Sequence, residues 1–504
     1  MNKRFLLLLF LILAAASVLR LFRLTQNPPG LYWDEVAIGY NAYSVLKTGR
    51  DEWNQTFPVL FRSYNDYKLP LYIYSVIPFE KLLGPTDLAV RLPSAFAGTL
   101  VVLATFLFVR ESAGPGNWGS VTGLLSAAFM AVSPWAIQFS RAAFEANLAM
   151  LFVCLGALCF LVFFRRSHWW LLFSMVFFAA SVYTYQSEKV FVPAFIAVLF
   201  SVYRRRLFSD WKKLFLIGVV TVIVLMPFFA TAFTFQGMAR ARSESVLNEP
   251  GELLTNLSQN YLANFSFDYL FFRGDQNGRH LVKKLGELYL WQLPLVLTGV
   301  YLLIKRRKNS NLIILSWLAL AALPPAVSRV SPHALRGLLM VIPLQIVSVV
   351  GLVFWVKKLW PYRYISLPIF CVIAAYSLAL YLSLYYRFFP HAYAADWQTG
   401  NKEAVSYLKK ISPDYDRIFV ASDLPPMYFL FYLPIDPNRI QQSGHDLTQI
   451  DRFTFFDSGK PVIPAAAGQR TLILAPWWNV SQDTKLIRQI KLPNGSPEYG
   501  IYEL

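Results

Sequence analysis

The chain has 504 residues, of which 56% are hydrophobic and 15% charged, and its mean hydropathy is +0.42. Soluble globular proteins carry roughly 25% charged residues and about 45–50% apolar ones. This composition excludes a disordered chain, a collagen-like repeat, a small disulfide scaffold and an ordinary soluble enzyme, because so much apolar surface cannot be hidden in a water-exposed protein. The sequence therefore predicts a protein that crosses a membrane several times.

The net charge of +18 suggests nucleic-acid binding, but the position of the charges argues against it. Each dense basic run lies in a short break between long apolar stretches, at residues 165–166, 204–213, 305–308 and 357–358. This is the positive-inside pattern of a membrane protein. We therefore expect membrane lipid around the chain and no nucleic-acid partner.

Eleven apolar segments approach the ~20 residues that a bilayer core requires. The first, at residues 5–22, follows two basic residues as a secretory signal does. We expect it to be an uncleaved helix, because its apolar character continues and no clean small-residue cleavage site follows. The other segments lie at about 88–110, 118–138, 146–164, 168–184, 189–203, 213–233, 286–304, 311–328, 336–356 and 364–385.

A cytoplasmic N-terminus places every basic run on the cytoplasmic side. We therefore expect a multi-pass protein of the cell's inner or plasma membrane, with three stretches facing outward. In the first loop, residues 25–87, the segments 35–46 and 69–83 have the pattern of amphipathic helices on the membrane surface. The second stretch is the polar loop at about 234–285.

The third outward stretch is the tail, where apolar runs shorten to strand length at residues 417–421, 471–475 and 499–504. Residues 401–411 have a helical pattern. We therefore expect a transmembrane domain of residues 1–385 and a small extracytoplasmic α/β domain of residues 386–504.

Acidic and basic residues at the mouths of membrane helices are informative, because they are costly to place there. Asp34 and Glu35 follow Tyr32-Trp33 at the start of the first surface helix. Asp34 is suited to cap that helix, and the residues alone favour this interpretation. The alternative is a carboxylate that acts as general base for an acceptor hydroxyl.

Asp66, Tyr67 and Lys68 precede the second surface helix. This cluster is suited to a sugar-phosphate headgroup, with Lys68 paired to a phosphate oxygen. An interfacial aromatic belt with a snorkelling lysine is the alternative.

Arg141 and Glu145 are four residues apart at the outer end of the third span, where we expect them to share a helix face. A simple ion pair would explain them. An arginine on the outer side, however, runs against the positive-inside trend and indicates an anionic partner.

Two short outer turns carry further polar side chains. Tyr183 and Tyr185 are candidates to line a sugar pocket, while His333 and Arg336 are candidates to face a phosphate. A hydrogen-bonded turn explains each pair about equally well. The sequence has no nucleotide loop, dinucleotide fingerprint or His-Glu-x-x-His zinc motif, so a sugar donor would have to reach the outer face attached to a lipid.

Several of these motifs resemble a known family. They are Pro-Pro-Gly-Leu-Tyr-Trp-Asp-Glu at 28–35, Gly-Tyr-Asn-Ala-Tyr at 39–43, Asp-Tyr-Lys-Leu-Pro-Leu-Tyr-Ile-Tyr at 66–74 and Ala-Val-Arg-Leu-Pro-Ser-Ala at 89–95. Together they resemble the bacterial protein O-mannosyltransferase-like glycosyltransferases, a group that includes the aminoarabinose transferase of lipid A and has the GT-C membrane fold.

The resemblance implies transfer of a sugar from a polyprenyl-phosphate carrier to an acceptor at the outer membrane face, with inversion. By position, Asp34 matches the acidic residue at the catalytic centre, with Glu35 beside it, and Lys68 matches the lysine that meets the donor phosphate. Arg141 and Glu145 match the basic and acidic positions after the third span.

One departure concerns metal binding. In the aminoarabinose branch an acid precedes the loop lysine and helps to bind a metal, whereas here Tyr67 stands in that position and Asp66 lies one residue further back. The sequence therefore assigns no metal ligand and no certain cofactor, and it leaves a divalent metal open.

We therefore expect an integral-membrane glycosyltransferase that uses a hexosyl or pentosyl polyprenyl phosphate, with a glycolipid, a polysaccharide or a protein as acceptor. The alternatives are a transporter or flippase for lipid-linked saccharides, or an inactive relative. A transporter would place ionisable residues near mid-membrane and pair broken helices. An inactive relative would have lost Asp34, which is present.

Overall fold

A computed structural model describes residues 3–64, 66–114, 116–207, 211–248, 250–458, 469–477 and 484–503. Contacts within the chain divide it into two compact units. The helical unit comprises Met1–Phe22, Tyr64–Tyr72 and Pro93–Leu384, and the mixed unit comprises Arg23–Ser63, Ile73–Leu92 and Tyr385–Leu504. Each unit is described by itself.

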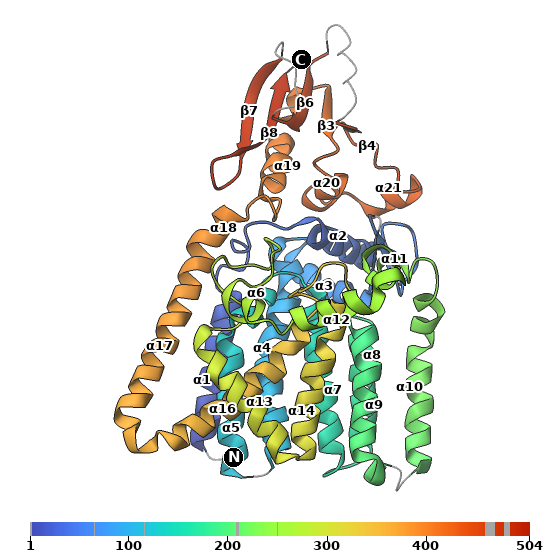
Figure 1. Cartoon of the computed structure of the whole chain (residues 1–504). Coiled ribbons are helices and arrows are strands. Elements are labelled where there is room, and N and C mark those ends of the chain that lie inside the picture. The colour runs from blue at the N-terminus through green and yellow to red at the C-terminus, as the bar shows by residue number, and fades with distance from the viewer. Residues whose placement is uncertain are drawn as a thin grey trace. The chain divides into compact units, whose positions relative to one another are not determined.

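The helical unit is built of long apolar helices (Figure 1). Helix α4 belongs to it from Pro93 onward. Every predicted apolar segment contains a helix. The segments 118–138 and 311–328 each contain a second helix, which has a proline at its first or second position. These helices are α1 (Lys3–Leu21), α4 (Asp87–Ala113), α5 (Asn117–Val132), α6 (Pro134–Phe139), α7 (Glu145–Phe163), α8 (Trp169–Val182), α9 (Glu188–Leu207), α10 (Trp211–Ala232), α13 (Leu293–Arg306), α14 (Asn309–Ala321), α15 (Leu323–Ala326), α16 (Val341–Lys358) and α17 (Arg363–Ser383).

Seven helices in the described part of the chain are long and apolar enough to cross a membrane. Helices α5, α8 and α13 have 16, 14 and 14 residues, fewer than the ~20 of a full span. The multi-pass character is therefore confirmed, while the number of eleven spans stays a prediction.

Neighbouring helices pack closely where glycine allows it. Helices α13 and α16 lie against each other, and a Cβ atom on Gly299 of α13 would come within 2.1 Å of the Val347 carbonyl oxygen. A Cβ atom on Gly351 of α16 would come within 2.0 Å of the Leu295 carbonyl oxygen. Small residues facing each other bring helix backbones together where no hydrophobic effect from water drives association.

The segment between α10 and α13 covers the predicted polar loop of residues 234–285 and the start of the predicted apolar segment 286–304, and it contains short helices. They are α11 (Ala239–Glu244), η2 (Val246–Asn248), η3 (Pro250–Glu252), α12 (Leu253–Ala263), the π-helix η4 (Asp268–Phe272) and η5 (Leu290–Gln292). The helical unit also holds β2 (Asp66–Lys68), η6 (Leu338–Met340) and η7 (Trp360–Tyr362).

The mixed unit contains a six-stranded sheet in the order β4-β5-β3-β6-β8-β7. Strand β3 is parallel to β5 and β6, and the other pairs are antiparallel. The strands are β3 (Arg417–Ala421), β4 (Gln449–Ile450), β5 (Phe453–Phe456), β6 (Thr471–Pro476), β7 (Lys485–Lys491) and β8 (Pro497–Glu503), and the helices beside them in the tail are α18 (Phe389–Ala392), α19 (Thr399–Ile411), η9 (Ser412–Asp414), α20 (Pro426–Tyr432) and α21 (Pro437–Gln442).

The small C-terminal α/β domain is thus confirmed. Residues 417–421 are β3, residues 471–475 lie in β6 and residues 401–411 lie in α19. The predicted strand 499–504 lies in β8, except for Leu504, which is outside the described residues.

Most of the first loop belongs to the same unit as the tail. Both predicted surface helices form, as α2 (Trp33–Thr48) and α3 (Pro70–Leu83). Helix α2 packs on α20 and α21. The Tyr428 hydroxyl donates to the Leu31 carbonyl at 3.0 Å, and the Tyr40 hydroxyl donates to the Ile435 carbonyl at 3.3 Å. The helical unit ends at Leu384, and the first loop groups with the tail, which was not expected.

Candidate functional site

Asp34 lies in the first turn of α2 and is partly buried. The N-cap residue is Tyr32, and its backbone N–H donates to the Glu35 carboxylate at 3.3 Å. The interpretation of Asp34 as the N-cap is therefore wrong, because the helix begins at Trp33, two residues earlier than that role requires. Its carboxylate lies at the end of the helix where the dipole favours negative charge.

Glu35 is fully buried and forms an ion pair with Arg91. Arg91 Nε donates to Glu35 Oε1 at 3.0 Å, and Arg91 Nη2 donates to Glu35 Oε2 at 2.9 Å. The same guanidinium also donates to the carbonyls of Leu24, Pro28 and Gly30. The pair thus connects the segment before α2 to the start of that helix. It thereby fixes the position of the backbone at the neighbouring Asp34.

Arg141 precedes α7 instead of lying within it. Its side chain is fully buried and donates to the carbonyls of Leu19 at 2.8 Å and Phe22 at 2.6 Å, at the C-terminal end of α1. A cation at this end of a helix satisfies carbonyls that have no partner in the helix. The expectation that Arg141 shares a helix face with Glu145 is wrong, because α7 begins at Glu145 and Arg141 lies in the preceding bend.

The Asp66–Lys68 cluster forms strand β2. Lys68 is buried, with 4% of its surface exposed. Asp66 Oδ2 lies 3.6 Å from Nη1 of Arg240, which comes from α11. The Tyr67 carbonyl accepts a hydrogen bond from Gln186 at 3.4 Å. Asn65, in the motif before this strand, lies outside the described residues.

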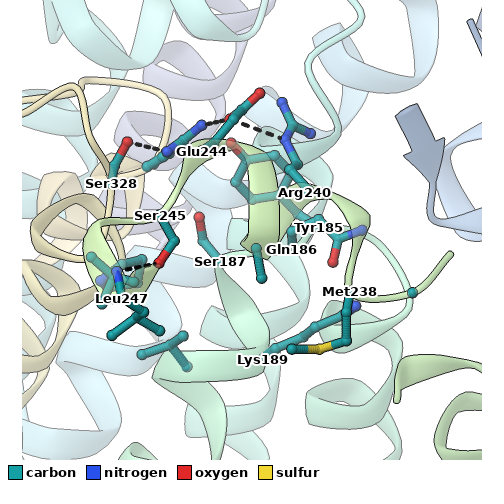
Figure 2. Close-up of a pocket in the computed structure, with 16 residues that line it drawn as sticks. Tyr185, Gln186, Ser187, Lys189, Met238, Arg240, Glu244, Ser245, Leu247 and Ser328 are labelled. Carbon is teal, nitrogen blue, oxygen red and sulfur yellow. Dashed lines mark hydrogen bonds and ion pairs between the residues drawn. The ribbon is translucent and has the colours of Figure 1, made fainter. Parts of the chain in front are cut away.

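A cavity of about 240 Å³ lies beside this cluster in the helical unit (Figure 2). Its charged lining residues are three cations and one carboxylate: Lys189, Arg240, Arg336 and Glu244. The apolar part of its wall is made by Val190, Met238, Leu247, Pro324 and Val327. The cavity therefore combines an excess of positive charge with an apolar wall.

Ion pairs organise the polar side of the cavity (Figure 2). Glu244 pairs with Arg240, Oε2 to Nε at 3.5 Å, and with Arg336, which also donates to the Ser328 hydroxyl. Burial raises the pKa of Tyr185 against the opposing effect of the nearby Arg240 and Arg336. The Tyr185 phenol therefore keeps its proton and presents a hydrogen-bond donor.

Tyr183 does not line this cavity. Its hydroxyl accepts from the Phe228 N–H and donates to the Val224 carbonyl, both at 2.9 Å. These two groups would bond to each other in a regular helix, and Pro227 between them disturbs α10. Tyr183 therefore bridges an interrupted turn of α10.

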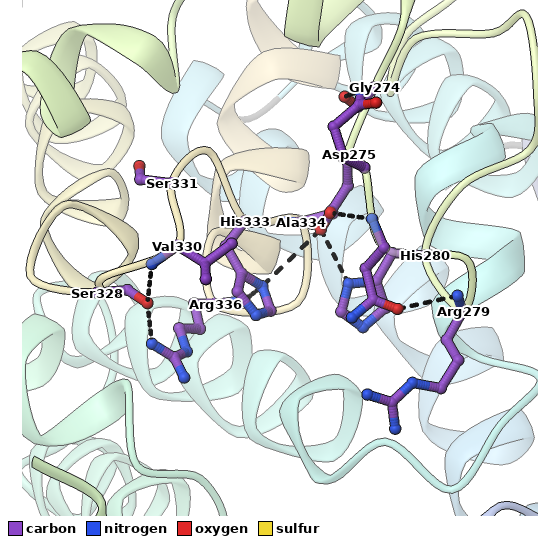
Figure 3. Close-up of polar contacts among 12 residues, drawn as sticks. Gly274, Asp275, Arg279, His280, Ser328, Val330, Ser331, His333, Ala334 and Arg336 are labelled. Carbon is purple, nitrogen blue, oxygen red and sulfur yellow. Dashed lines mark hydrogen bonds and ion pairs between the residues drawn. The ribbon is translucent and has the colours of Figure 1, made fainter. Parts of the chain in front are cut away.

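His333 lies near Asp275 and His280 rather than in the cavity (Figure 3). Burial, followed by the charge of His280, lowers the pKa of His333 to about 3. Burial alone would raise the pKa of Asp275, but its hydrogen bond with His280 and the charge of His280 lower it to about 2. Asp275 is thus an anion and His333 is neutral near pH 7.

Five residues that organise these sites were missed by the sequence reasoning: Arg91, Arg240, Glu244, Asp275 and His280. Arg91 is an isolated charge in an apolar run, and such a residue indicates a buried partner. The chain has five histidines, so His280 in a polar outer loop was a second available signal. For Glu244 and Asp275 the nearby Arg240 and His280 were not enough of a signal, because the partners that complete each cluster, Arg336 and His333, lie far away in the sequence.

Residues 68–230 match the family model described as dolichyl-phosphate-mannose-protein mannosyltransferase. No curated protein matches the chain by sequence. Two solved structures of ArnT from Cupriavidus metallidurans, one in the apo state and one bound to undecaprenyl phosphate, each have a TM-score of 0.59 at 12% identity and cover 99% of this chain and 97% of theirs. The chain has the GT-C fold.

A second likeness agrees with this fold. The apo oligosaccharyltransferase of Archaeoglobus fulgidus has a TM-score of 0.53 at 14% identity, covering 87% of this chain and 64% of its own. The comparisons confirm the resemblance found in the sequence motifs. The family match supports a glycosyltransferase that uses a lipid-linked donor, and the likeness to the solved structures shows the GT-C fold.

Proposed function

We propose that this chain is an inverting glycosyltransferase of the cell's inner or plasma membrane that moves a hexosyl or pentosyl group from a polyprenyl phosphate to an acceptor hydroxyl at the outer face. The observation that carries the proposal is the cavity in which Arg240 and Arg336 meet an apolar wall. A lipid-linked sugar has the same two parts, a phosphate and a hydrocarbon chain. The ArnT structure bound to undecaprenyl phosphate supports this choice of ligand.

In this proposal, Arg240, Arg336 and Tyr185 bind the donor phosphate. Glu244 pairs with both guanidinium groups, and we propose that the donor phosphate replaces its carboxylate there. Guanidinium groups form paired, charge-assisted hydrogen bonds to phosphate oxygens. As the bond to the sugar breaks, negative charge grows on the leaving phosphate, and these donors stabilise it.

The helical unit supplies further candidates for the donor. Lys68 is proposed as an additional phosphate partner, since it lies two residues from Asp66, which pairs with Arg240. Glu145, whose charge raises the pKa of Tyr185, is proposed to bind a sugar hydroxyl or to assist catalysis. Arg141 is proposed as a positioning residue, because its guanidinium donates to two carbonyls of the α1 end.

Asp34 is proposed as the general base that takes the proton of the acceptor hydroxyl. It is partly buried at the start of α2, where the adjacent Glu35–Arg91 pair holds the backbone. Both carboxylate oxygens of Glu35 bond to Arg91, so we assign Glu35 a positioning role.

The first test is transfer of radiolabel by the full chain in lipid nanodiscs, with a panel of polyprenyl-phosphate sugars and a membrane extract as acceptor. Asp34→Asn keeps the shape of the side chain and removes the base, so we expect a loss of transfer of 100-fold or more with the fold intact. Asp414→Asn, an exposed tail variant, serves as control. The labelled product identifies the sugar and shows whether the acceptor is a glycolipid, a polysaccharide or a protein. Full activity of Asp34→Asn would remove the base assignment.

The second test measures binding of undecaprenyl phosphate. Arg336→Gln removes one cation from the cavity, and we expect at least tenfold weaker binding, as for the loss of one charge-assisted contact. Arg205→Gln, at the exposed end of α9, is the control and should bind like the native chain. Unchanged binding by Arg336→Gln would show that this cavity does not hold the donor. Specific binding of donors without any transfer would instead favour a transporter or an inactive relative.

A further inference from the structure

Two segments of the helical unit bring one carboxylate and two imidazoles together (Figure 3). Asp275 and His280 lie between η4 and η5, and His333 lies in the turn before η6. Asp275 Oδ2 is 2.8 Å from His280 Nδ1 and 3.9 Å from His333 Nδ1. One ligand atom from each residue lies within 4.8 Å of the other two.

The three side chains are held in place by their surroundings. Asp275 Oδ2 accepts the Ala334 N–H at 2.8 Å, and the Asp275 N–H donates to Glu287 Oε1 at 3.0 Å. The His280 ring packs against Phe139 and Phe144, with ring centroids 5.2 and 5.7 Å away. The surrounding contacts thus fix the orientation of the three side chains. Hydrogen bonds from outer residues usually orient metal ligands in the same way.

The distances suit a small divalent ion. Zinc bonds of ~2.0–2.2 Å in a tetrahedron separate ligand atoms by roughly 3.3 Å, and the two measured separations lie on either side of that value. The side chains of Asp275 and His280 are each 3% exposed, and that of His333 is 14% exposed. Small side-chain movements would therefore complete three ligand bonds in a site largely shielded from water.

Charges around the cluster act in both directions. Arg240 and Arg279 are close enough to His333 to repel a cation. The Asp275 carboxylate lies directly among the ligand atoms, and the Glu287 carboxyl lies behind it. The ligand atoms would bond directly to the ion, whereas the two arginines would repel it from a longer distance. The local arrangement therefore favours binding of a cation.

We propose that Asp275, His280 and His333 bind one divalent transition-metal ion, with zinc as the best fit, and leave a fourth position to water or an anion. Two imidazoles and a carboxylate are ligands that zinc accepts readily. The proposal does not rest on the proposed glycosyltransferase function. The alternative is a hydrogen-bonded cluster that ties two segments together without a metal.

The test uses the full chain in nanodiscs, with any histidine tag removed and bound metal stripped by a chelator. Zinc content after equilibrium dialysis is measured by mass spectrometry, and Co²⁺ is titrated while its visible absorption is followed. We expect one ion per native chain and the intense spectrum of tetrahedral cobalt. His333→Ala changes the most exposed of the three residues, and it should weaken binding at least tenfold.

A matched control is His168→Ala, which removes a histidine at the start of α8 and should bind like the native chain. His280→Gln provides a second variant, and size-exclusion profiles report whether each variant is folded. Zinc should also raise the melting temperature of the native chain but not that of His333→Ala. Native protein that binds no zinc, or folded cluster variants that bind it like the His168 variant, would overturn the proposal in favour of the hydrogen-bonded cluster.

Discussion

At the scale of single residues, buried arginines in each unit donate hydrogen bonds to backbone carbonyls. In the helical unit, Arg20 of α1 donates to the carbonyls of Met130 and Ala131 at the end of α5, at 3.2 Å each. Within the mixed unit, Arg91 donates to three carbonyls and to Glu35. Burying a charge is costly unless it is paired and hydrogen-bonded, so these arginines must form such contacts to remain in an apolar interior.

The Glu35–Arg91 pair leads to a prediction about stability. Arg91→Ala leaves the Glu35 charge buried without its partner, so we expect a loss of about 3 kcal/mol or more in the free energy of unfolding. Thermal unfolding of the full chain in detergent measures it. Arg91→Lys should rescue little, because an ammonium cannot form the paired contact.

The exposed Arg439–Asp451 pair, at 2.7 Å, is the matched control for this measurement. Arg439→Gln should cost less than about 1 kcal/mol, because water screens the pair. Equal losses for Arg91→Ala and Arg439→Gln would contradict a special role for the buried pair.

At the scale of elements, helix α10 depends on a side chain from outside it. The Tyr183 hydroxyl, just after α8, lies between the Phe228 N–H and the Val224 carbonyl. Pro227 has no N–H to donate, and its ring conflicts with the turn before it, so the helix needs another donor and acceptor at this point. A hydroxyl supplies both.

Tyr183→Phe tests this role against the sugar-binding role. We expect a loss of about 1 kcal/mol in stability, the usual value of one hydrogen bond, and no change in KM for the donor. Tyr185→Phe, which changes the cavity wall, should instead raise KM. Thermal unfolding and donor-dependent kinetics separate the two effects. A raised KM for Tyr183→Phe at native stability would favour the sugar pocket.

At the scale of the whole molecule, the first loop and the tail share one compact unit although most of the chain separates them. Within this unit, Gln441 Nε2 donates to the Thr48 hydroxyl and to the Asp51 carbonyl, at 3.0 and 2.9 Å. These contacts hold the end of α2. At its start, beside Asp34, the Trp33 N–H donates to Oε1 of Gln398 at 2.8 Å, so the folded tail supports this end of the helix as well as Arg91 does. A truncated chain without the tail would lose this support.

Stability of the mixed unit should depend on pH through Glu498 in β8. Burial raises the pKa of Glu498 to about 7, against a weaker opposing hydrogen bond from the Gly400 backbone. The folded state thus favours the protonated carboxyl of Glu498. The contribution of this group to the stability of the mixed unit is therefore greatest below about pH 4.5, and it decreases as the pH rises to about 7. The expected loss is about 3 kcal/mol.

Hydrogen exchange of β8 and α19 in the full chain at pH 5 and pH 8 measures this loss. Glu498→Gln should remove the pH dependence and stabilise the unit at pH 8. Glu403→Gln is the control, since Glu403 is exposed and pairs with Arg488 at 2.8 Å. Equal pH dependence in the native chain and Glu498→Gln would assign the effect to another group.

Local patterns explain why some predictions were correct and others were not. Strand β3 and helix α19 were predicted closely, because their periodicity depends on neighbouring residues. The capping role of Asp34 failed because Tyr32 and Glu35 form the cap, a choice that depends on how Arg91 holds Glu35. Tyr183 was expected in a sugar pocket because no local signal shows a contact with α10.

The sequence by itself determined that this is a multi-pass membrane protein with an α/β tail and motifs of a lipid-linked glycosyltransferase family. Hydropathy, charge placement and motifs are properties of consecutive residues, so they can be read without a fold. Only the tertiary structure decided that Arg240 meets Asp66 and Glu244, and that His333 meets Asp275. Such contacts join segments that are distant in the chain, and they exist only after the helices have packed.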